Sequence, residues 1–519
     1  MSINLETLPT PSVVAETQKT RTLRLYAVKL HQWLAIFGGG ALLLWGLSGL
    51  LHPLMTTFGR QQETFLPPQR QMDLQAIHPV NQTLTRAGIE HASAVKVIVG
   101  EKENLLQVTE IQDAPRRYFH LQTGEELVGY DQSHAVYLAR HFMNLAGEPV
   151  RKVQMLTTFS PEYPAVNRLL PVYRIEFDRE DGLVAYVYTE TNALASVTDT
   201  WKSSLQQAFQ WVHTWSWMPQ KAEWVRVLLI GFLIASIVLM SISGVLMLVM
   251  IRRVTRAPGL RGWHRVMGYA LALPVFAFSS SGLFHLIEYG WEQPVRYLKL
   301  SPAVDFSTST FPIHNQWRDI SQGLNVNGLS LVQTDKGESL YRLSLAAARN
   351  AAPESSNAIR NARFDGVERT GPALYLNAGD GSVWTPGDKE LAMQLGERFT
   401  GAPREAIQKI ALVTRFGPSY DFRNKRLPVW QIDYKAPVNA TIFVDTATGV
   451  LADVTKDSAK PERFSFSFLH KWNFLFPLGR NVQNFIVSTA VILILVFVAA
   501  FGLQMYFRRR LGSPRGRMS

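Results

Sequence analysis

The sequence has 519 residues, of which 47% are hydrophobic and 18% charged, and its formal net charge is +12. It contains no cysteine, which excludes disulfides, thiolate catalysis, iron–sulfur clusters, cysteine-bound zinc and covalently attached c-type haem. Because much of the positive charge lies beside apolar segments, it gives no separate indication of nucleic-acid binding.

Four apolar segments are each long enough to cross a bilayer, which takes about 20 apolar residues. The predicted transmembrane helices are 30–54, 223–251, 263–289 and 482–508. The rest of the chain comprises a tail (1–29), a long segment (55–222), a short link (252–262), a second long segment (290–481) and a second tail (509–519). The first apolar segment is too long for a signal-peptide core and lacks a cleavage site, so we expect it to be retained.

Lysine and arginine predict the orientation of these helices, because cytoplasmic loops carry an excess of both. They gather before the first helix, between the second and third, and after the fourth. The residues are Lys19, Arg21, Arg24, Lys29, Arg252, Arg253, Arg256, Arg261, Arg265, Arg508, Arg509 and Arg510. Both termini and the link are therefore predicted to be cytoplasmic. The two long segments are then predicted to be periplasmic, in a multi-pass protein of a bacterial inner membrane.

The two halves of the chain are similar, which predicts an internal duplication. SGLLHP (48–53) at the end of the first helix matches SGLFHL (281–286), 233 residues later. SPEYPAVNRLLPVY (160–173) matches GPSYDFRNKRLPVW (417–430), 257 residues later. The difference of 24 residues between the two shifts predicts an insertion within the second long segment, where 344–363 is expected to form a loop or an added helix.

Alternating apolar residues on either side of turn-forming residues predict a β-hairpin in each long segment. The strands are 172–178 and 184–190 in the first, and 429–435 and 441–446 in the second. Helical patterns precede them at 134–147 and 389–401. The predicted fold is a four-helix membrane bundle with two extracytoplasmic α+β domains, each a helix on a small antiparallel sheet.

Six of the twelve histidines lie at the edges of the apolar segments and match between the halves. The pairs are His31 with His264, His52 with His285, and His213 with His470. The other six have no match and are predicted to be ordinary domain residues: His78, His91, His120, His134, His141 and His314. Polar side chains at membrane depth are costly unless they have a function or a partner. Without cysteine, matched imidazoles indicate axial ligands of non-covalent haem b.

Helix geometry makes such pairs feasible. His31 and His52 are 21 residues apart, about 31 Å along one helix and about 60° around it. Both can therefore face the bundle interior at opposite membrane faces, so that His31 meets His264 near the cytoplasm. Four histidines remain for the outer face (His52, His285, His213 and His470), and the sequence leaves their pairing and the choice of one or two haems open.

Each of these features also has a more ordinary interpretation. A single histidine can be an interfacial residue or a helix cap, and zinc is a competing metal, although the helices hold almost no carboxylates. Small residues can admit a porphyrin or simply pack helices; they are Gly38, Gly39, Gly40, Gly46, Gly49, Ser279, Ser280, Ser281 and Gly282. Trp211, Trp215 and Trp217 can form an interfacial aromatic belt.

The motifs LHQWLAIFGGG (30–40), WHRVMGYALAL (263–273), WVHTW (211–215) and FLHKW (468–472) resemble those of the PepSY-associated transmembrane family. That family includes inner-membrane ferric-siderophore reductases. The resemblance, which covers nearly the whole chain, implies PepSY-like outer domains and two or three haem b groups. It implies haem-iron ligation by six histidines: His31, His264, His52, His285, His213 and His470. His264 departs from the motif in being preceded by Trp263.

The leading hypothesis is an oxidoreductase that takes electrons from quinol or a cytoplasmic reductant and reduces periplasmic ferric iron, held as a ferric siderophore. Its catalytic residues are not identified. The glycines at 38–40 lie inside a helix, so they are no dinucleotide-binding motif. Tyr163 and Tyr420 either line a substrate groove or stabilise turns. The alternatives are a non-enzymatic PepSY-type regulator and a redox subunit for another periplasmic acceptor.

Overall fold

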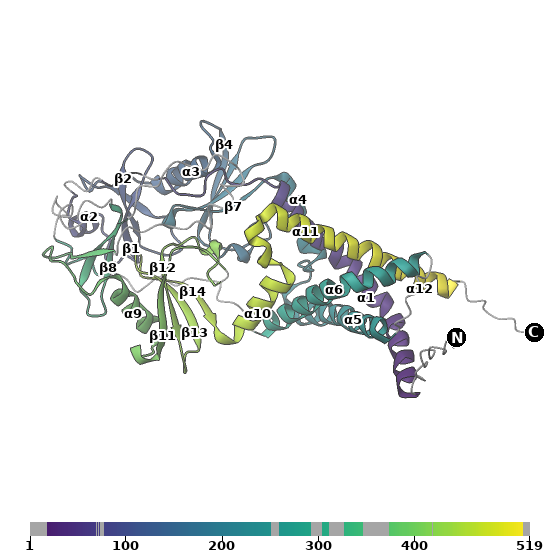
Figure 1. Cartoon of the computed structure of the whole chain (residues 1–519). Coiled ribbons are helices and arrows are strands. Elements are labelled where there is room, and N and C mark those ends of the chain that lie inside the picture. The colour runs from purple at the N-terminus through teal and green to yellow at the C-terminus, as the bar shows by residue number, and fades with distance from the viewer. Residues whose placement is uncertain are drawn as a thin grey trace, which may run out of the picture. The chain divides into compact units, whose positions relative to one another are not determined.

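The computed structural model describes residues 18–68, 70, 72, 77–250, 259–291, 304–310, 326–345, 373–417 and 419–511. The chain forms two compact units (Figure 1). The helical unit comprises 1–53, 209–291 and 465–519, and the sheet unit comprises 54–208 and 292–464. Most of the predicted link and insertion, the outer parts of both tails and His314 lie outside the described residues.

Among its described residues, the helical unit contains four apolar helices that are long enough to span a membrane, as predicted. They are α1 (Gln18–Phe58), α5 (Glu223–Met250), α6 (Leu260–Trp291), and α11 (Arg480–Leu493) continued by the π-helix η9 (Ile494–Ala500) and α12 (Phe501–Leu511). Pro274 lies inside α6, which membrane helices tolerate because neighbouring groups compensate for the lost hydrogen bond. The chain is thus a multi-pass membrane protein.

A short helix comes before α5 and another before α11 along the chain. The amphipathic α4 (Thr200–Val212) ends just before His213, and the π-helix η7 (Phe466–His470) ends at His470. The chain reverses two residues after each histidine, where Trp215 and Trp472 adopt left-handed φ values of 54° and 52°. Such values are rare for non-glycine residues, and the two tryptophans are 257 positions apart.

The sheet unit is built on a six-stranded antiparallel sheet that uses both long segments. Its order is β10 (Leu374–Asn377), β9 (Ser339–Leu345), β8 (Val326–Gln333), β1 (Ala94–Val99), β2 (Asn104–Thr109) and β3 (Arg117–His120). Strands β1 and β8 join the two segments, with Val95 opposite Leu331. The sequence predicts separate sheets for the two segments, whereas this part of the structure shares one.

Two four-stranded antiparallel sheets complete the sheet unit. The first has β4 (Val150–Leu156), β5 (Val172–Phe177), β6 (Val184–Tyr188) and β7 (Ala193–Thr198), with α3 (Tyr130–Met143) packed on it. The second has β11 (Ile407–Val413), β12 (Val429–Tyr434), β13 (Ala440–Asp445) and β14 (Val450–Lys456), with α9 (Gly387–Thr400) packed on it. Both predicted hairpins and both helix-on-sheet arrangements are confirmed.

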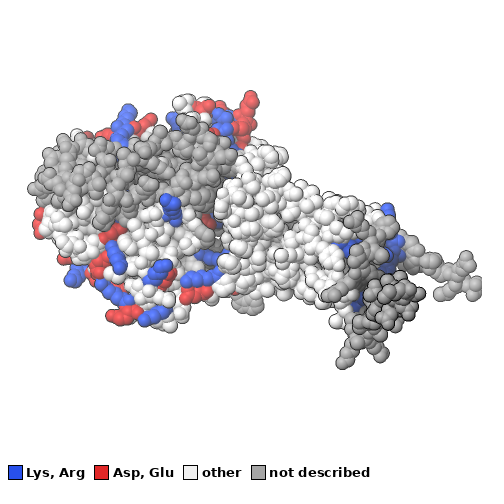
Figure 2. All heavy atoms as spheres, in the orientation of Figure 1, with Lys and Arg blue, Asp and Glu red and all other residues white. Residues whose placement is uncertain are grey.

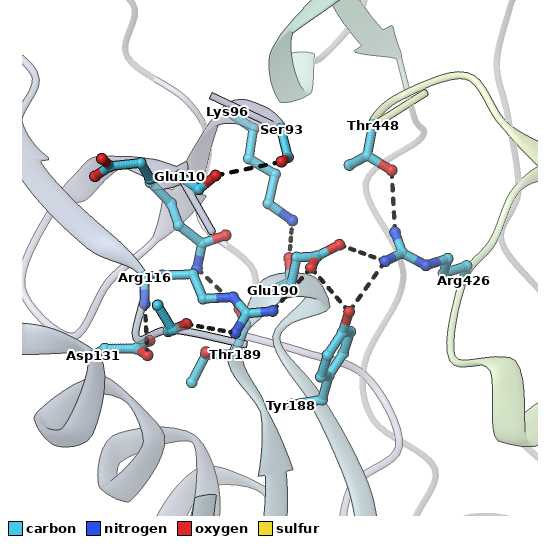
Figure 3. A network of polar contacts seen from close by, with 12 residues as sticks. Ser93, Lys96, Glu110, Arg116, Asp131, Tyr188, Thr189, Glu190, Arg426 and Thr448 are labelled. Atoms are coloured by element: carbon cyan, nitrogen blue, oxygen red, sulfur yellow. Dashed lines mark hydrogen bonds and ion pairs between the residues drawn. The ribbon is translucent and has the colours of Figure 1, made fainter. Parts of the chain in front are cut away.

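A buried polar network connects the two long segments inside the sheet unit (Figure 3). Glu190 pairs with Arg116 at 3.0 Å and with Arg426, and it accepts the Tyr188 hydroxyl at 2.9 Å. The Lys96 ammonium donates to the backbone carbonyl of Glu190. Burial would raise the pKa of Glu190, but the neighbouring cations outweigh it and hold that pKa well below its ordinary value.

Candidate histidine centres of the helical unit

His31 on α1 and His264 on α6 lie side by side in the helical unit. Their ring centroids are 6.4 Å apart and their planes are inclined at 63°. The sequence predicts that both lie at the same end of the bundle. In the structure the two residues, which occupy matching positions of α1 and α6, are in fact neighbours. This pair is called the inner pair below.

The Nδ1 atoms of the inner pair bind backbone carbonyls. His31 Nδ1 lies 3.0 Å from the carbonyl oxygen of Met240, and His264 Nδ1 lies 3.0 Å from that of Phe497. Since a carbonyl only accepts, each Nδ1 carries the proton and donates it. Nε2 is then the nitrogen left with a lone pair, and this tautomer can bind a metal through Nε2.

Each inner ring also lies against a glycine of the neighbouring span. A Cβ atom on Gly244 would be 3.3 Å from Cε1 of His31, and one on Gly502 would be 3.2 Å from Cε1 of His264. Both distances are shorter than ordinary carbon contacts. Larger residues at these positions would therefore displace the imidazoles.

His213 and His470 form a second group, the outer pair. His213 Nδ1 lies 3.0 Å from the Ser48 hydroxyl, and His470 Nδ1 lies 3.1 Å from the carbonyl of Phe278. Burial, helped by the proximity of His470 and His52, lowers the pKa of His213 to about 3. Burial also lowers the pKa of His470 to about 4, against the opposing effect of its backbone hydrogen bond. Both imidazoles are neutral near pH 7, as metal ligation requires.

His52 and His285 are each linked to one histidine of the outer pair through a phenylalanine. Phe209 contacts His52 at a centroid distance of 6.3 Å and stacks on His213 at 4.5 Å. Phe466 stacks on His285 at 3.9 Å and on His470 at 4.6 Å. The four outer histidines, whose pairing the sequence leaves open, thus form two His–Phe–His groups.

Neither phenylalanine is among the site residues predicted from the sequence. A signal was present, because each stands four residues before its histidine and the two are 257 positions apart. Residues four apart in a helix share a face, so an aromatic residue at that spacing is expected to contact the imidazole.

Matching contacts also hold the chain that follows each outer histidine. Trp215 stacks on Trp45, and Trp472 stacks on Phe278. The residue after each outer histidine also accepts a hydrogen bond from a side chain of the next span. The two donors are 257 positions apart. Arg226 donates to the carbonyl of Thr214 at 2.7 Å, and Gln483 donates to that of Lys471 at 2.7 Å.

Some of the small residues pack helices together and others lie beside the outer histidines. The tryptophans differ in the same way, because some are exposed and one packs inside the helical unit. Gly39 and Gly46 face Leu503 and Leu495, which is helix packing. Gly49 and Gly282 instead face the rings of His213 and His470, where an added Cβ atom would lie 3.8 Å and 3.5 Å from the nearest ring atom. Trp211 and Trp217 are exposed, as an interfacial belt requires, whereas Trp215 packs beside the outer pair.

The centroid distance within the inner pair is compatible with one metal held between His31 and His264. Metal–imidazole bonds are about 2.0 Å long, so two rings on opposite sides of one metal have centroids roughly 6 Å apart. None of the four histidines is fully buried. Over the described ranges, no three or more His, Asp or Glu side chains are grouped to hold a metal ion. The geometry therefore suits two-ligand haem better than zinc, which takes three or four protein ligands.

Tyr163 and Tyr420 have no exposed surface. The Tyr163 hydroxyl donates to the carbonyl of Leu169, and the two rings stack at 4.7 Å on Tyr186 and Phe443 respectively. Fully buried side chains do not line a groove, so a turn-stabilising role is the one that fits. Four of the unmatched histidines in the sheet unit, namely His78, His120, His134 and His141, have local partners, such as Asn192 for His134.

Comparisons with known proteins found no family model that matches the chain and no curated protein that matches it. The resemblance to PepSY-associated transmembrane proteins therefore rests on the sequence motifs alone.

Proposed function

We propose that the protein is a haem b-containing oxidoreductase of a bacterial inner membrane, which uses electrons to reduce periplasmic ferric iron presented as a ferric siderophore. The observation that carries this proposal is the arrangement of four imidazoles in the helical unit. Each has its Nδ1 atom hydrogen-bonded, which leaves Nε2 for a metal. Neutral imidazoles are ligands that hold the iron of a non-covalently bound haem.

In this proposal the inner pair holds one haem and the outer pair holds a second. His31 and Ser48, the contact of His213, are 17 residues apart on α1, which is about 26 Å along a helix. The two centres would thus lie at different membrane depths. His52 and His285 support the outer pair through Phe209 and Phe466 rather than ligating iron, which narrows the six predicted ligands to four.

Haem bound between such imidazoles supplies a one-electron carrier. The chain's own residues supply neutral ligands of fixed orientation, and the apolar core around Ala41, Ile237 and Leu271 keeps water from the bundle interior. Each ferric ion takes up one electron, from quinol or a cytoplasmic reductant. The resulting Fe(II) is held less tightly by oxygen ligands suited to Fe(III), so reduction would release iron from a siderophore.

The proposed orientation places the basic end of the helical unit in the cytoplasm. Figure 2 shows Lys and Arg gathered at one end of the helices, with an almost uncharged surface along their length. Arg24, Lys29, Arg261, Arg265 and Arg508 are among the basic residues near these helix ends. The positive-inside rule then supports a periplasmic sheet unit. Contacts repeated at shifts of 233 and 257 residues support the proposed duplication.

The decisive experiment is the optical spectrum of the purified full-length protein, together with its haem content. We expect a red protein with a b-type spectrum that changes on reduction by dithionite, and two haems per chain by pyridine haemochrome. Colourless protein from haem-replete cells would refute the proposal. Adding a ferric siderophore to the reduced protein should reoxidise it rapidly, and slow reoxidation would favour a different periplasmic acceptor.

A non-enzymatic membrane regulator is the second candidate. One observation favours it: a centroid separation of 6.4 Å is also usual for two aromatic rings in contact. Under this alternative, a variant with all six boundary histidines replaced by alanine keeps its biological function, whereas the reductase loses it.

A further inference from the structure

The four imidazoles of the inner and outer pairs do not share one kind of Nδ1 partner. The Nδ1 atoms of His31, His264 and His470 lie within 3.1 Å of helix backbone carbonyls, those of Met240, Phe497 and Phe278 respectively. His31 lies near a hydroxyl as well, that of Ser243 at 3.1 Å, in addition to its backbone partner. The Nδ1 atom of His213 instead lies 3.0 Å from the side-chain hydroxyl of Ser48. A side-chain partner can be removed by mutation, whereas a backbone carbonyl cannot.

Ser48 is placed to accept this hydrogen bond. It is nearly fully buried on α1, and its hydroxyl donates to the carbonyl of Leu44 at 2.8 Å. With its proton committed to Leu44, the Ser48 oxygen presents its lone pairs to His213 Nδ1, which must then be the donor. Donation to Leu44 also polarises the hydroxyl and makes its oxygen a better acceptor.

The matching residue in the second half of the chain makes a different contact. Ser281, 233 positions later, lies 3.4 Å from His470 Nδ1, and the carbonyl of Phe278 is closer at 3.1 Å. His470 therefore keeps a backbone acceptor if Ser281 is replaced, whereas His213 loses its hydroxyl partner if Ser48 is replaced. The backbone of His213 is held separately, because the Trp45 indole donates to its carbonyl at 3.0 Å.

We propose that Ser48 is a positioning residue for the outer pair: its hydroxyl holds His213 with Nε2 as the metal-binding nitrogen and lowers the redox potential of that centre. This inference rests on the proposed haem function. An acceptor on Nδ1–H makes Nε2 more basic and so stabilises the ferric state of bound haem. Losing that acceptor should make the ferrous state easier to form.

The test compares three variants of the full-length protein in detergent: Ser48→Ala, Ser281→Ala as the matched control, and Ser48→Thr, which keeps a hydroxyl. The readouts are potentiometric titration of the haem absorbance, the low-spin ferric EPR signals and haem content. In Ser48→Ala we expect one of two redox transitions to move to higher potential while the other stays. In Ser281→Ala the potential of that transition should shift less, and in Ser48→Thr it should return to the wild-type value. Weaker retention of one haem, by about tenfold or more, with recovery in Ser48→Thr, would also support the role.

Two redox transitions that are unchanged in Ser48→Ala would overturn the inference while leaving the haem proposal intact. That result is expected if His213 turns instead to the carbonyl of Trp45, which lies 3.3 Å from the Ser48 hydroxyl. A lower melting temperature with unchanged potentials would show a structural role only, and so would also overturn it. Wild-type protein without haem would refute the proposed function itself.

Discussion

Glycines decide, at the scale of single residues, how each inner imidazole is seated. Gly244 and Gly502 lie against the Cε1 edges of His31 and His264, so that a methyl group at either position would press on the ring, at 3.3 Å and 3.2 Å. Their effect on the fold alone should be small, since alanine is a better helix former than glycine. Substitution here therefore separates the histidine site from helix stability.

We predict that Gly244→Ala displaces the His31 ring by a few tenths of an ångström and weakens the inner centre. Haem content by pyridine haemochrome should fall from two per chain toward one. Gly40→Ala is the matched control, because a Cβ there would meet nothing within 4 Å. Equal haem content in the two variants would contradict this seating of His31.

Lys96 provides a prediction about pH. Burial, partly offset by Glu190, lowers its pKa from 10.5 to about 8. Between these two values the unfolded chain binds more protons than the folded one, so this residue's contribution to stability rises with pH. As the pH rises from 8 to 10, the melting temperature of the wild-type protein minus that of Lys96→Met should increase. A constant difference between the two across this range would argue against the depressed pKa.

At the scale of elements, the π-helix η9 explains a change in spacing between the two halves. The carbonyl and the glycine that contact His31 are four residues apart, at Met240 and Gly244, whereas those that contact His264 are five apart, at Phe497 and Gly502. A π-turn accommodates one extra residue in a helix, often at functional sites. The extra residue in η9 therefore leaves both contacts on one face.

Deleting Ala499 from η9 should convert it to a regular α-helix with the four-residue spacing of α5. We predict that this variant keeps two haems per chain. Deleting Ser241 from α5, which has no π-turn, should instead rotate Gly244 away from His31 and cost the inner haem. The haem content of the two deletion variants tests both expectations. Loss of haem when Ala499 is deleted would show that the π-turn itself is needed.

At the scale of the whole molecule, the buried network around Glu190 joins segments that are far apart in the chain. Glu190 lies in the first long segment, and its partner Arg426 lies in the second. Arg426 in turn pairs with Asp445 at 3.0 Å. The contribution of such a network to stability depends on its completeness, because a buried charge left without its partner is costly.

We predict that Glu190→Gln destabilises the sheet unit by about 3–5 kcal/mol, since it leaves Arg116 and Arg426 without their shared carboxylate. Thermal unfolding of the full-length protein in detergent measures the change. Glu397→Gln, which removes a partly exposed partner of Arg404, should cost about 1 kcal/mol or less. Similar losses in both variants would contradict a special role for the buried network.

The sequence alone predicted the features that depend on local pattern. The four spans follow from apolar length, and the hairpins follow from alternation over a few residues. The matched histidines follow from comparing the two halves. These features can be predicted without a structure because the pattern of apolar residues within a segment largely determines which local structure buries them.

Tertiary structure decided the features that depend on which segments meet. The backbone partners of His31 and His264 leave no trace in residue types, since every residue carries a carbonyl. The division of the outer histidines by Phe209 and Phe466 depends on how α4 and η7 pack. The pairing of β1 with β8 joins residues more than 200 positions apart, and no local pattern specifies which distant strand supplies the hydrogen bonds that a strand edge leaves open.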